Sequence, residues 1–479
     1  MEENLLLRFE GDIIRYGILT LKNPYKFEIN KGNQYAVIGR NGCGKSLLAR
    51  IIRTKDTVIP NRAIMPNNKL KIGQVEFRDI YSVLPQNAES EGYYQQRYHA
   101  TDNDEAPTVL ELIKRNKNSE KWLELANKLN LHDMFDKKIN FLSSGELRKY
   151  VLISALIDMP EVFIIDNPYI GLDEAARKSL NELLNQVKQE GKITIIMLLN
   201  DYNDIPDWIT HIIPMGEREV LPIVKKEDAS SIIKKIYDIN QIKFPTLHLE
   251  NKDTAPFNIA CELNDCVIKY GKRTILNNVS WMVKRGERWS LSGPNGAGKS
   301  TLLSIICADN PQSYANKVTL FDYHRGNGES IWDIKKRIGF VSPEMHLFFN
   351  QQNPLIEVVA SGFRDTVGMY IRANSEQKEK ALQWLKYFGI EQYAEENFRT
   401  LSTGIQRLGL VARSMIKNPD LLILDEPMHG LDTLNKQLVL HLVEEFCKNP
   451  EKTLIYVSHY RNEIPPCVNQ EKVLCRNNQ

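Results

Sequence analysis

The sequence contains a long-period repeat whose first landmark is a glycine-rich loop. Residues 39–46 and 293–300 both fit the pattern G-x-x-x-x-G-K-S, and 254 positions separate their lysines, Lys45 and Lys299. Each loop follows a short apolar stretch and precedes a helical one, which is the setting of a phosphate-binding loop. Because 479 residues exceed what one hydrophobic core usually holds, the repeat predicts two domains of one design.

Four later landmarks recur at a constant spacing of 259 positions. The pairs are Ser143 and Ser402, Asp166 and Asp425, Asp173 and Asp432, and Asn200 and His459. We therefore expect a first domain over residues 1–223 and a second over residues 258–479. The stretch between them, residues 224–257, is polar and contains proline, which is typical of a linker.

Apolar runs without polar alternation mark the expected strands. Such runs are typical of parallel strands that are buried on both faces. They occupy residues 162–166, 193–197, 421–425 and 453–457. Residues 108–141 and 355–398 have mainly helical patterns instead. The expected fold class is therefore α/β, with a helical insertion in each domain.

The two glycine-rich loops are predicted to bind the phosphates of ATP. Glycines let backbone N–H groups surround a phosphate, the lysine reaches the β- and γ-phosphate oxygens, and the following serine is a ligand for Mg²⁺. An incidental glycine turn is the alternative, and two copies in register count against it. The predicted binding residues are Gly39, Asn41, Gly42, Gly44, Lys45, Ser46 and Leu47, and Gly293, Asn295, Gly296, Gly298, Lys299, Ser300 and Thr301.

Two serine-containing motifs precede the acidic strands. Residues 142–146 are Leu-Ser-Ser-Gly-Glu, and residues 401–405 are Leu-Ser-Thr-Gly-Ile. A serine hydroxyl beside the N–H groups of a helix start suits an anion, although an ordinary helix cap would explain either motif alone. Together with the loops, these motifs resemble the ABC ATPase family, whose signature is Leu-Ser-Gly-Gly-Gln. The resemblance covers nearly the whole chain and implies two tandem P-loop NTPase domains, each a RecA-like α/β core with an inserted helical subdomain.

The resemblance also implies an intramolecular dimer of the two cassettes, in which each signature completes the other cassette's ATP site. The first site would be closed by a signature in which Thr403 and Ile405 replace the usual glycine and glutamine. The second site would be closed by a signature close to the family pattern. The predicted nucleotide contacts from the two signatures are Ser143, Gly145 and Glu146, and Ser402 and Gly404.

The resemblance makes the two sites unequal in catalysis. Glu426 matches the family's general base and His459 its switch histidine, whereas Asn167 and Asn200 occupy these places in the first half. Because an amide cannot accept a proton, we expect a loss of about 10²–10⁴ in rate at the first site. The predicted catalytic residues are Glu426, His459 and Lys299.

Further family positions follow from spacing. Tyr16 and Tyr270 each precede the first glycine of their loop by 23 positions, matching the adenine-stacking aromatic, although a core role in a strand is the alternative. Gln86 fits the glutamine of the γ-phosphate-sensing loop. In the second half either Pro343 or Glu344 occupies that position. The predicted metal ligands are Ser46, Ser300, Asp166, Asp425 and Gln86.

Composition limits the alternatives. Lys plus Arg number 62 against 60 Asp plus Glu, so there is no strong case for binding nucleic acid. The seven cysteines are an odd number without C-x-x-C spacing, which favours reduced thiols. Cys43 lies beside Lys45 at a helix start, where a thiol pKa can be depressed, but a small loop residue is the favoured interpretation. No apolar run reaches the ~20 residues that span a bilayer, so the expected location is cytoplasmic or peripheral at the inner membrane face, beside a separate permease.

The prediction is an ATPase that hydrolyses mainly at the second site and powers or regulates a transporter. Residues 358–370 resemble the ModF/PhrA group, tandem cassettes linked by name to molybdate transport or photorepair. ABC-F translation factors are an alternative, but they have a long basic linker and two glutamate bases. Tandem sugar importers are a further alternative, but their degenerate cassette is usually the second, whereas Asn167 and Asn200 lie in the first half of this chain. A nucleotide-gated scaffold without enzyme activity would not need Glu426 and His459.

Overall fold

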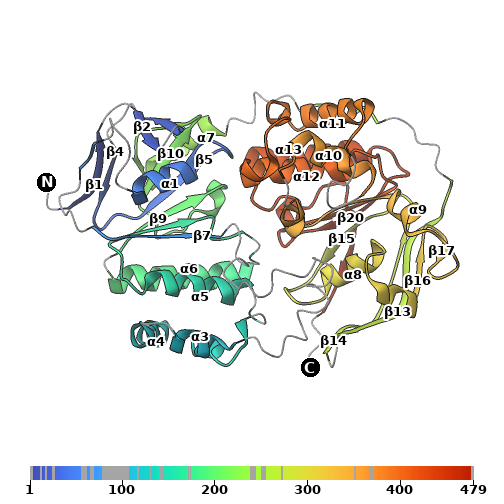
Figure 1. The fold of residues 1–479 in the computed structure, drawn as a ribbon, viewed down its shortest axis with the longest axis horizontal. Coiled ribbons are helices and arrows are strands. Elements are labelled where there is room, and N and C mark those ends of the chain that lie inside the picture. Colours follow the sequence, from blue (N-terminus) through green and yellow to red (C-terminus); the bar gives the residue numbers. More distant parts are fainter. Residues whose placement is uncertain are drawn as a thin grey trace. The chain divides into compact units, whose positions relative to one another are not determined.

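The computed structural model describes residues 4–10, 13–16, 19–23, 27–54, 62–64, 70–77, 107–115, 118–129, 131–139, 142, 144–170, 172, 174–191, 193–237, 244–249, 255–270, 273–349, 352–365 and 372–475. The chain divides into two compact units (Figure 1). The first comprises Met1–Ile242 with Gly430–Leu434, and the second comprises Lys243–His429 with Asn435–Gln479. Within the described residues, no helix is long and apolar enough to span a membrane.

A parallel sheet forms the centre of the first unit. Its strands run in the order β7-β8-β9-β5-β10. The strands β5, β8 and β9 are buried along their whole length, as the apolar runs predict. Their bounds are β5 Tyr35–Gly39, β7 Ile72–Glu76, β8 Val162–Asp166, β9 Thr194–Leu199 and β10 His211–Gly216.

Short strands and helices surround this sheet. A separate antiparallel sheet has the order β4-β1-β6, and the edge of the central sheet continues through β11, β3 and β2, with β12 paired to β10. The strand bounds are β1 Leu5–Glu10, β2 Ile13–Tyr16, β3 Leu19–Lys22, β4 Phe27–Asn30, β6 Arg62–Ile64, β11 Glu219–Val220 and β12 Val224–Lys225. The helices are α1 Lys45–Thr54, α3 Val109–Arg115, α4 Ser119–Lys128, α5 Ser144–Leu156, α6 Glu174–Gly191 and α7 Ser230–Ile236.

The second unit repeats the parallel sheet with the same order of equivalent strands, β18-β19-β20-β15-β21. Beside it lies a four-stranded sheet in the order β14-β13-β16-β17. The strand bounds are β13 Ile259–Tyr270, β14 Arg273–Lys284, β15 Arg288–Ser292, β16 Lys317–Leu320, β17 Tyr323–His324, β18 Ile338–Val341, β19 Leu421–Asp425, β20 Thr453–Val457 and β21 Gln470–Val473. The helices are α8 Lys299–Ile306, α9 Ile331–Lys335, α10 Leu355–Ala360, α11 Ser375–Tyr387, α12 Thr403–Met415 and α13 Thr433–Cys447.

These elements confirm the predicted α/β class with helical insertions. Helices α3 and α4 lie between β7 and β8, and α10 and α11 lie between β18 and β19. Within the segment expected to be a linker, β12 pairs with β10 and α7 packs on the core of the first unit. The domain boundaries at residues 223 and 258 stay a prediction.

The parallel topology brings distant residues to one sheet edge. Ile38 at the end of β5 pairs with Leu199 at the end of β9, and Asp166 at the end of β8 pairs with Leu198. In the second unit, Val457 of β20 is the partner of both Leu291 and Asp425. Since ligands of such sheets bind beyond the carboxyl ends of the strands, each unit places its glycine loop and acidic residue at one edge.

Candidate nucleotide-binding and hydrolysis sites

The two glycine-rich loops have the same internal geometry. Lys45 Nζ donates to the carbonyl oxygen of Gly39 at 2.7 Å, and Lys299 Nζ donates to that of Gly293 at 2.7 Å. Each lysine also donates to the next carbonyl along the loop, at 3.1 Å and 3.2 Å. Both lysines are buried. A nucleotide phosphate would be able to replace these carbonyls as the partner of either lysine.

A glycine before each lysine is required by the backbone and by a close neighbour. Gly44 has φ +106° and Gly298 has φ +92°. A Cβ at either position would lie 2.7 Å from a leucine Cδ2, that of Leu21 or Leu276. These loops place the predicted contacts Gly39, Asn41, Gly42, Ser46 and Leu47, and Gly293, Asn295, Gly296, Ser300 and Thr301, in the loop or in the first turn of the following helix.

The first unit brings together the predicted metal ligands Ser46 and Asp166. Ser46 Oγ donates to Asp166 Oδ2 at 2.7 Å, and Asn167 Nδ2 donates to Asp166 Oδ1 at 2.6 Å. Asp166 is only 1% exposed. A hydroxyl and a carboxylate oxygen are ligands that suit Mg²⁺, so this pair fits the predicted metal. Its role in metal binding stays a prediction.

In the second unit, the predicted base and the predicted switch histidine lie in contact. His459 Nε2 lies 2.9 Å from Glu426 Oε1, with side chains 9% and 20% exposed. Strand β19 ends at the buried Asp425, directly before Glu426. Glu426 has φ +47° and its counterpart Asn167 has φ +53°. The backbone is therefore similarly strained at positions 426 and 167, which carry different side chains.

The side chains around Glu426 stabilise the charged form of its carboxylate. Burial by itself raises the pKa of Glu426, but the bond with His459 and the charges of His429, His459 and Arg407 lower it further, to about 2. His429 and Arg407 were not predicted from sequence motifs. In the first half, Ile170 stands 259 positions before His429. Comparison of the two halves at that spacing is the signal that could have found both residues.

Arg407 also fixes the backbone around the base. Its guanidinium donates to the carbonyl of Glu426, to that of Asp425 at 3.4 Å and to that of Pro427 at 3.2 Å. A fourth bond, at 2.7 Å, reaches the carbonyl of Ser342 beyond the end of β18. The counterpart Arg148 donates to the carbonyl of Ile170 and lies over the ring of Phe77. Both arginines are buried.

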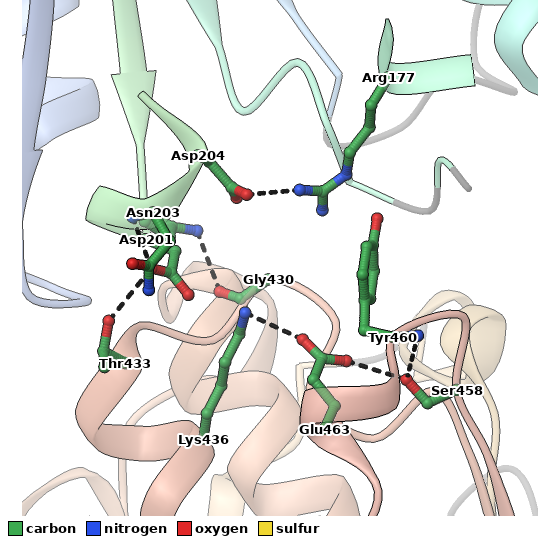
Figure 2. A network of polar contacts seen from close by, with 11 residues as sticks. Arg177, Asp201, Asn203, Asp204, Gly430, Thr433, Lys436, Ser458, Tyr460 and Glu463 are labelled. Carbon is green, nitrogen blue, oxygen red and sulfur yellow. Dashed lines mark hydrogen bonds and ion pairs between the residues drawn. The ribbon is translucent and has the colours of Figure 1, made fainter. Parts of the chain in front are cut away.

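Asn200 has a different partner from the one that His459 has. Its Nδ2 donates to the carbonyl of Gly430 at 3.0 Å, within the first unit, to which Gly430–Leu434 belongs. In the same segment, Asp432 Oδ2 accepts from the N–H of Asn41 at 2.6 Å. Thr433 Oγ1 donates to Asp201 Oδ1 at 3.3 Å (Figure 2). Asp432 was predicted from the repeat, and its counterpart Asp173 lies outside the described residues.

Most of the predicted signature residues lie in the described part of the structure. Ser402 is the N-cap of α12, and its Oγ accepts from the N–H of Ile405 at 3.4 Å. The helix-cap alternative therefore describes its geometry, and a phosphate contact stays a prediction, as it does for Gly404 in the first turn. Ser143 lies outside the described residues. A Cβ on Gly145 would lie 3.3 Å from that of Ala176. Glu146 Oε1 forms an ion pair with Lys137 Nζ at 2.5 Å.

The structure describes the remaining predicted positions only in part. Tyr270 ends β13, and its hydroxyl accepts from Asn310 Nδ2 at 3.1 Å while the ring packs on the core. The side chain of Tyr16 lies outside the described part of the structure.

The γ-phosphate-sensing loops are described only in part, and Gln86 is not among the described residues. Strand β7, the neighbour of β8, pairs Glu76 with Asp166 and ends there. In the second unit, β18 is followed by a 3₁₀ segment that begins at Pro343, and the Glu344 side chain is outside the description. Adenine stacking and γ-phosphate sensing stay predictions.

Cys43 is not an activated thiol. Burial raises its pKa from the ordinary value, and the charge of nearby Lys45 opposes this only in part. The side chain lies in a core cluster of the first unit. The favoured interpretation, a small residue that fits the loop, agrees with this environment.

Comparison with known proteins identifies the family. Residues 22–170 and 276–429 both match the family model described as ABC transporter. ModF of Escherichia coli, described as an ABC transporter ATP-binding protein, is 34% identical over 94% of this chain and 92% of its own length. An uncharacterised ABC transporter ATP-binding protein of Schizosaccharomyces pombe is 30% identical, with 93% and 92% covered. The resemblance predicted from residues 358–370 is thus confirmed for ModF.

Solved structures show the same architecture at lower identity. The RNase-L inhibitor aligns with a TM-score of 0.55 at 19% identity, covering 97% of this chain and 88% of that one. The structure of an archaeal ribosome recycling factor bound to a ribosomal stalk protein aligns with a TM-score of 0.54 at 18% identity, covering 96% and 86%. At such identities the likeness concerns the fold alone.

Proposed function

The chain belongs to the ABC transporter family of ATP-binding proteins, and from this premise we propose that it binds two ATP molecules and hydrolyses ATP mainly at the second cassette's site. The observation that carries the proposal is the contact of 2.9 Å between His459 and Glu426. The first site has Asn167 and Asn200 instead. Both phosphate loops retain one geometry, which supports nucleotide binding at each of them.

In the proposed reaction, Glu426 acts as the general base. Its low pKa keeps the carboxylate ionised at neutral pH. The carboxylate accepts a proton from water as the water oxygen attacks the γ-phosphorus, while the bond from that phosphorus to the bridging oxygen of ADP breaks. Asn167 can orient a water molecule, but its amide cannot accept the proton.

His459 and Lys299 bind the transferred group. When ATP is bound, His459 exchanges Glu426 for a γ-phosphate oxygen, which leaves the Glu426 carboxylate to hold the attacking water. Lys299 exchanges the carbonyls of its own loop for β- and γ-phosphate oxygens. Ser300 and Asp425 would hold Mg²⁺, directly and through water, and the bound ion neutralises phosphate charge.

A matched pair of substitutions tests the site assignment. We expect Glu426→Gln to lower the steady-state ATPase rate at least about 10²-fold, because it removes the base and keeps its shape. Asn167→Gln, at the same backbone position of the first site, should change the rate less than about twofold. Equilibrium binding of a fluorescent ATP analogue should persist in both. Undiminished hydrolysis in Glu426→Gln would refute the proposal.

We also propose that hydrolysis powers or regulates a separate membrane permease. The similarity to ModF, over nearly the whole length of both chains, supports this. The test is pull-down of tagged Glu426→Gln protein with ATP from detergent-solubilised membranes, with mass spectrometry of what co-purifies. A polytopic membrane protein released by Mg-ADP would support the proposal. Sedimentation with ribosomes, and not with a membrane protein, would contradict it.

A further inference from the structure

Each unit contains an ion pair that ties the start of a helix to a turn. In the second unit, Lys436 Nζ lies 3.0 Å from Glu463 Oε1, and in the first unit Arg177 pairs with Asp204 (Figure 2). Both members are offset by the repeat spacing of 259 positions. The two pairs use different side chains with the same order of charges. The repeat therefore preserves the charge pairing at this place.

The location of the pair links two functional segments. Lys436 lies in the first turn of α13 (Thr433–Cys447), which directly follows Asp432. Glu463 ends the 3₁₀ turn Arg461–Glu463, four residues after His459. The side chains of Lys436 and Glu463 are 21% and 15% exposed. This partial burial makes the pair less screened by solvent than an exposed surface salt bridge.

In the second unit, the same carboxylate has another bond. Ser458 Oγ donates to Glu463 Oε2 at 3.1 Å, and the N–H of Tyr460 donates to Ser458 Oγ at 3.0 Å (Figure 2). Ser458 and Tyr460 are the two neighbours of His459 in the chain. One oxygen of Glu463 therefore bonds the segment that carries His459, while the other pairs with α13. In the first unit, Leu199 stands at the place of Ser458 and has no hydroxyl to donate.

We propose that Glu463 is a positioning residue for His459, and that Lys436 transmits the orientation of α13 to it. This inference rests on the proposed hydrolysis at the second site. Glu463 acts through its neighbours: it holds Ser458 and thereby keeps the ring of His459 within reach of its partners. An ion pair between helix and turn is present in both units. The hydrogen bond from Ser458 to Glu463 depends on a hydroxyl that Leu199, the equivalent residue of the first unit, does not have.

The test compares equivalent substitutions in the two units. Glu463→Gln removes the charge and preserves the size, and Lys436→Met removes the other partner. We expect Glu463→Gln to lower kcat for ATP about tenfold with KM changed less than about twofold, and Lys436→Met to have a smaller effect in the same direction. The matched variants Asp204→Asn and Arg177→Met should leave kcat within about twofold of wild type.

Dependence on His459 separates positioning from a general loss of structure. In a His459→Ala background, Glu463→Gln should cause no further loss of kcat, because its effect passes through that ring. A further drop, or equal effects of Glu463→Gln and Asp204→Asn, would overturn the inference. Wild-type kcat in Glu463→Gln, with Glu426→Gln inactive, would overturn it while leaving the proposed function intact. Activity in Glu426→Gln would instead show that the proposed function is wrong.

Discussion

The two candidate nucleotide sites differ in charge, while corresponding segments of their backbones are alike. Each follows a buried strand that ends in aspartate, and the next residue has φ +53° in the first site and +47° in the second. The lysines of both phosphate loops bond carbonyls at corresponding places. The repeat has therefore preserved the loops that are predicted to receive phosphate. What has changed is the set of side chains that would act on the γ-phosphate.

The changes in the first site form a consistent set. In the second site, His459, His429 and Arg407 lower the pKa of the partly buried Glu426 carboxylate. In the first site, the neutral Asn167 takes the place of the carboxylate, and Asn200 and Ile170 take the places of the two histidines. Because a partly buried carboxylate needs favourable polar or charged neighbours, loss of the acid removes the need for both histidines. These changes are consistent with the proposal that the first site holds nucleotide without hydrolysing it.

The largest expected effect comes from removing the switch side chain. His459→Ala should lower kcat about 10²–10³-fold, which is typical when a donor to developing phosphate charge is lost. Asn200→Ala, the matched change, should lower kcat less than about threefold, because the first site contributes little to turnover. Steady-state ATPase assays at saturating ATP measure both. Similar losses in the two variants would show that the sites are not divided as the comparison states.

Much of the architecture could be predicted from the sequence, because burial on both faces leaves a visible mark. The apolar runs at 162–166 and 421–425 became β8 and β19 without a shift of bounds. The antiparallel sheets were not predicted. Strand β13 alternates buried and exposed residues only in part and contains register shifts against β14. Such pairing depends on contacts between strands, which periodicity within one strand does not report.

The site was predictable where motif spacing applied, and was missed where only folding brings residues together. Asp425 ends a strand, and Glu426 and His459 follow strands that end at the same edge, so their proximity could be predicted from the topology. Arg407 lies in α12, and its four carbonyl partners become visible only in three dimensions. The tie between Lys436 and Glu463 also joins a helix to a turn. The repeat spacing marks these positions but does not tell what they contact.

A smaller effect concerns pH. The folded-state pKa of Glu426, about 2, lies below its ordinary value of 4.5. The ionised group therefore stabilises the fold above pH 4.5, and this contribution is lost as the pH falls toward 2. Urea unfolding should show wild type losing stability more steeply than Glu426→Gln in that window, by at most about 1.4 kcal/mol per pH unit. Asn167→Gln should follow wild type. Parallel curves for wild type and Glu426→Gln would mean that the ion pair does not stabilise the carboxylate.

The smallest expected effect is the most informative about the first site. Asn167→Glu, made in a Glu426→Gln background, should raise the ATPase rate less than about twofold, although it restores the family's base. The new carboxylate would lie beside that of Asp166, while Asn200 is bonded to the carbonyl of Gly430 and Ile170 offers no charge. Adding Asn200→His and Ile170→His should recover more activity than Asn167→Glu alone, because the three changes rebuild the compensated carboxylate together. Full recovery with the single change would mean that the missing base alone silences the first site, and that the two histidines are dispensable.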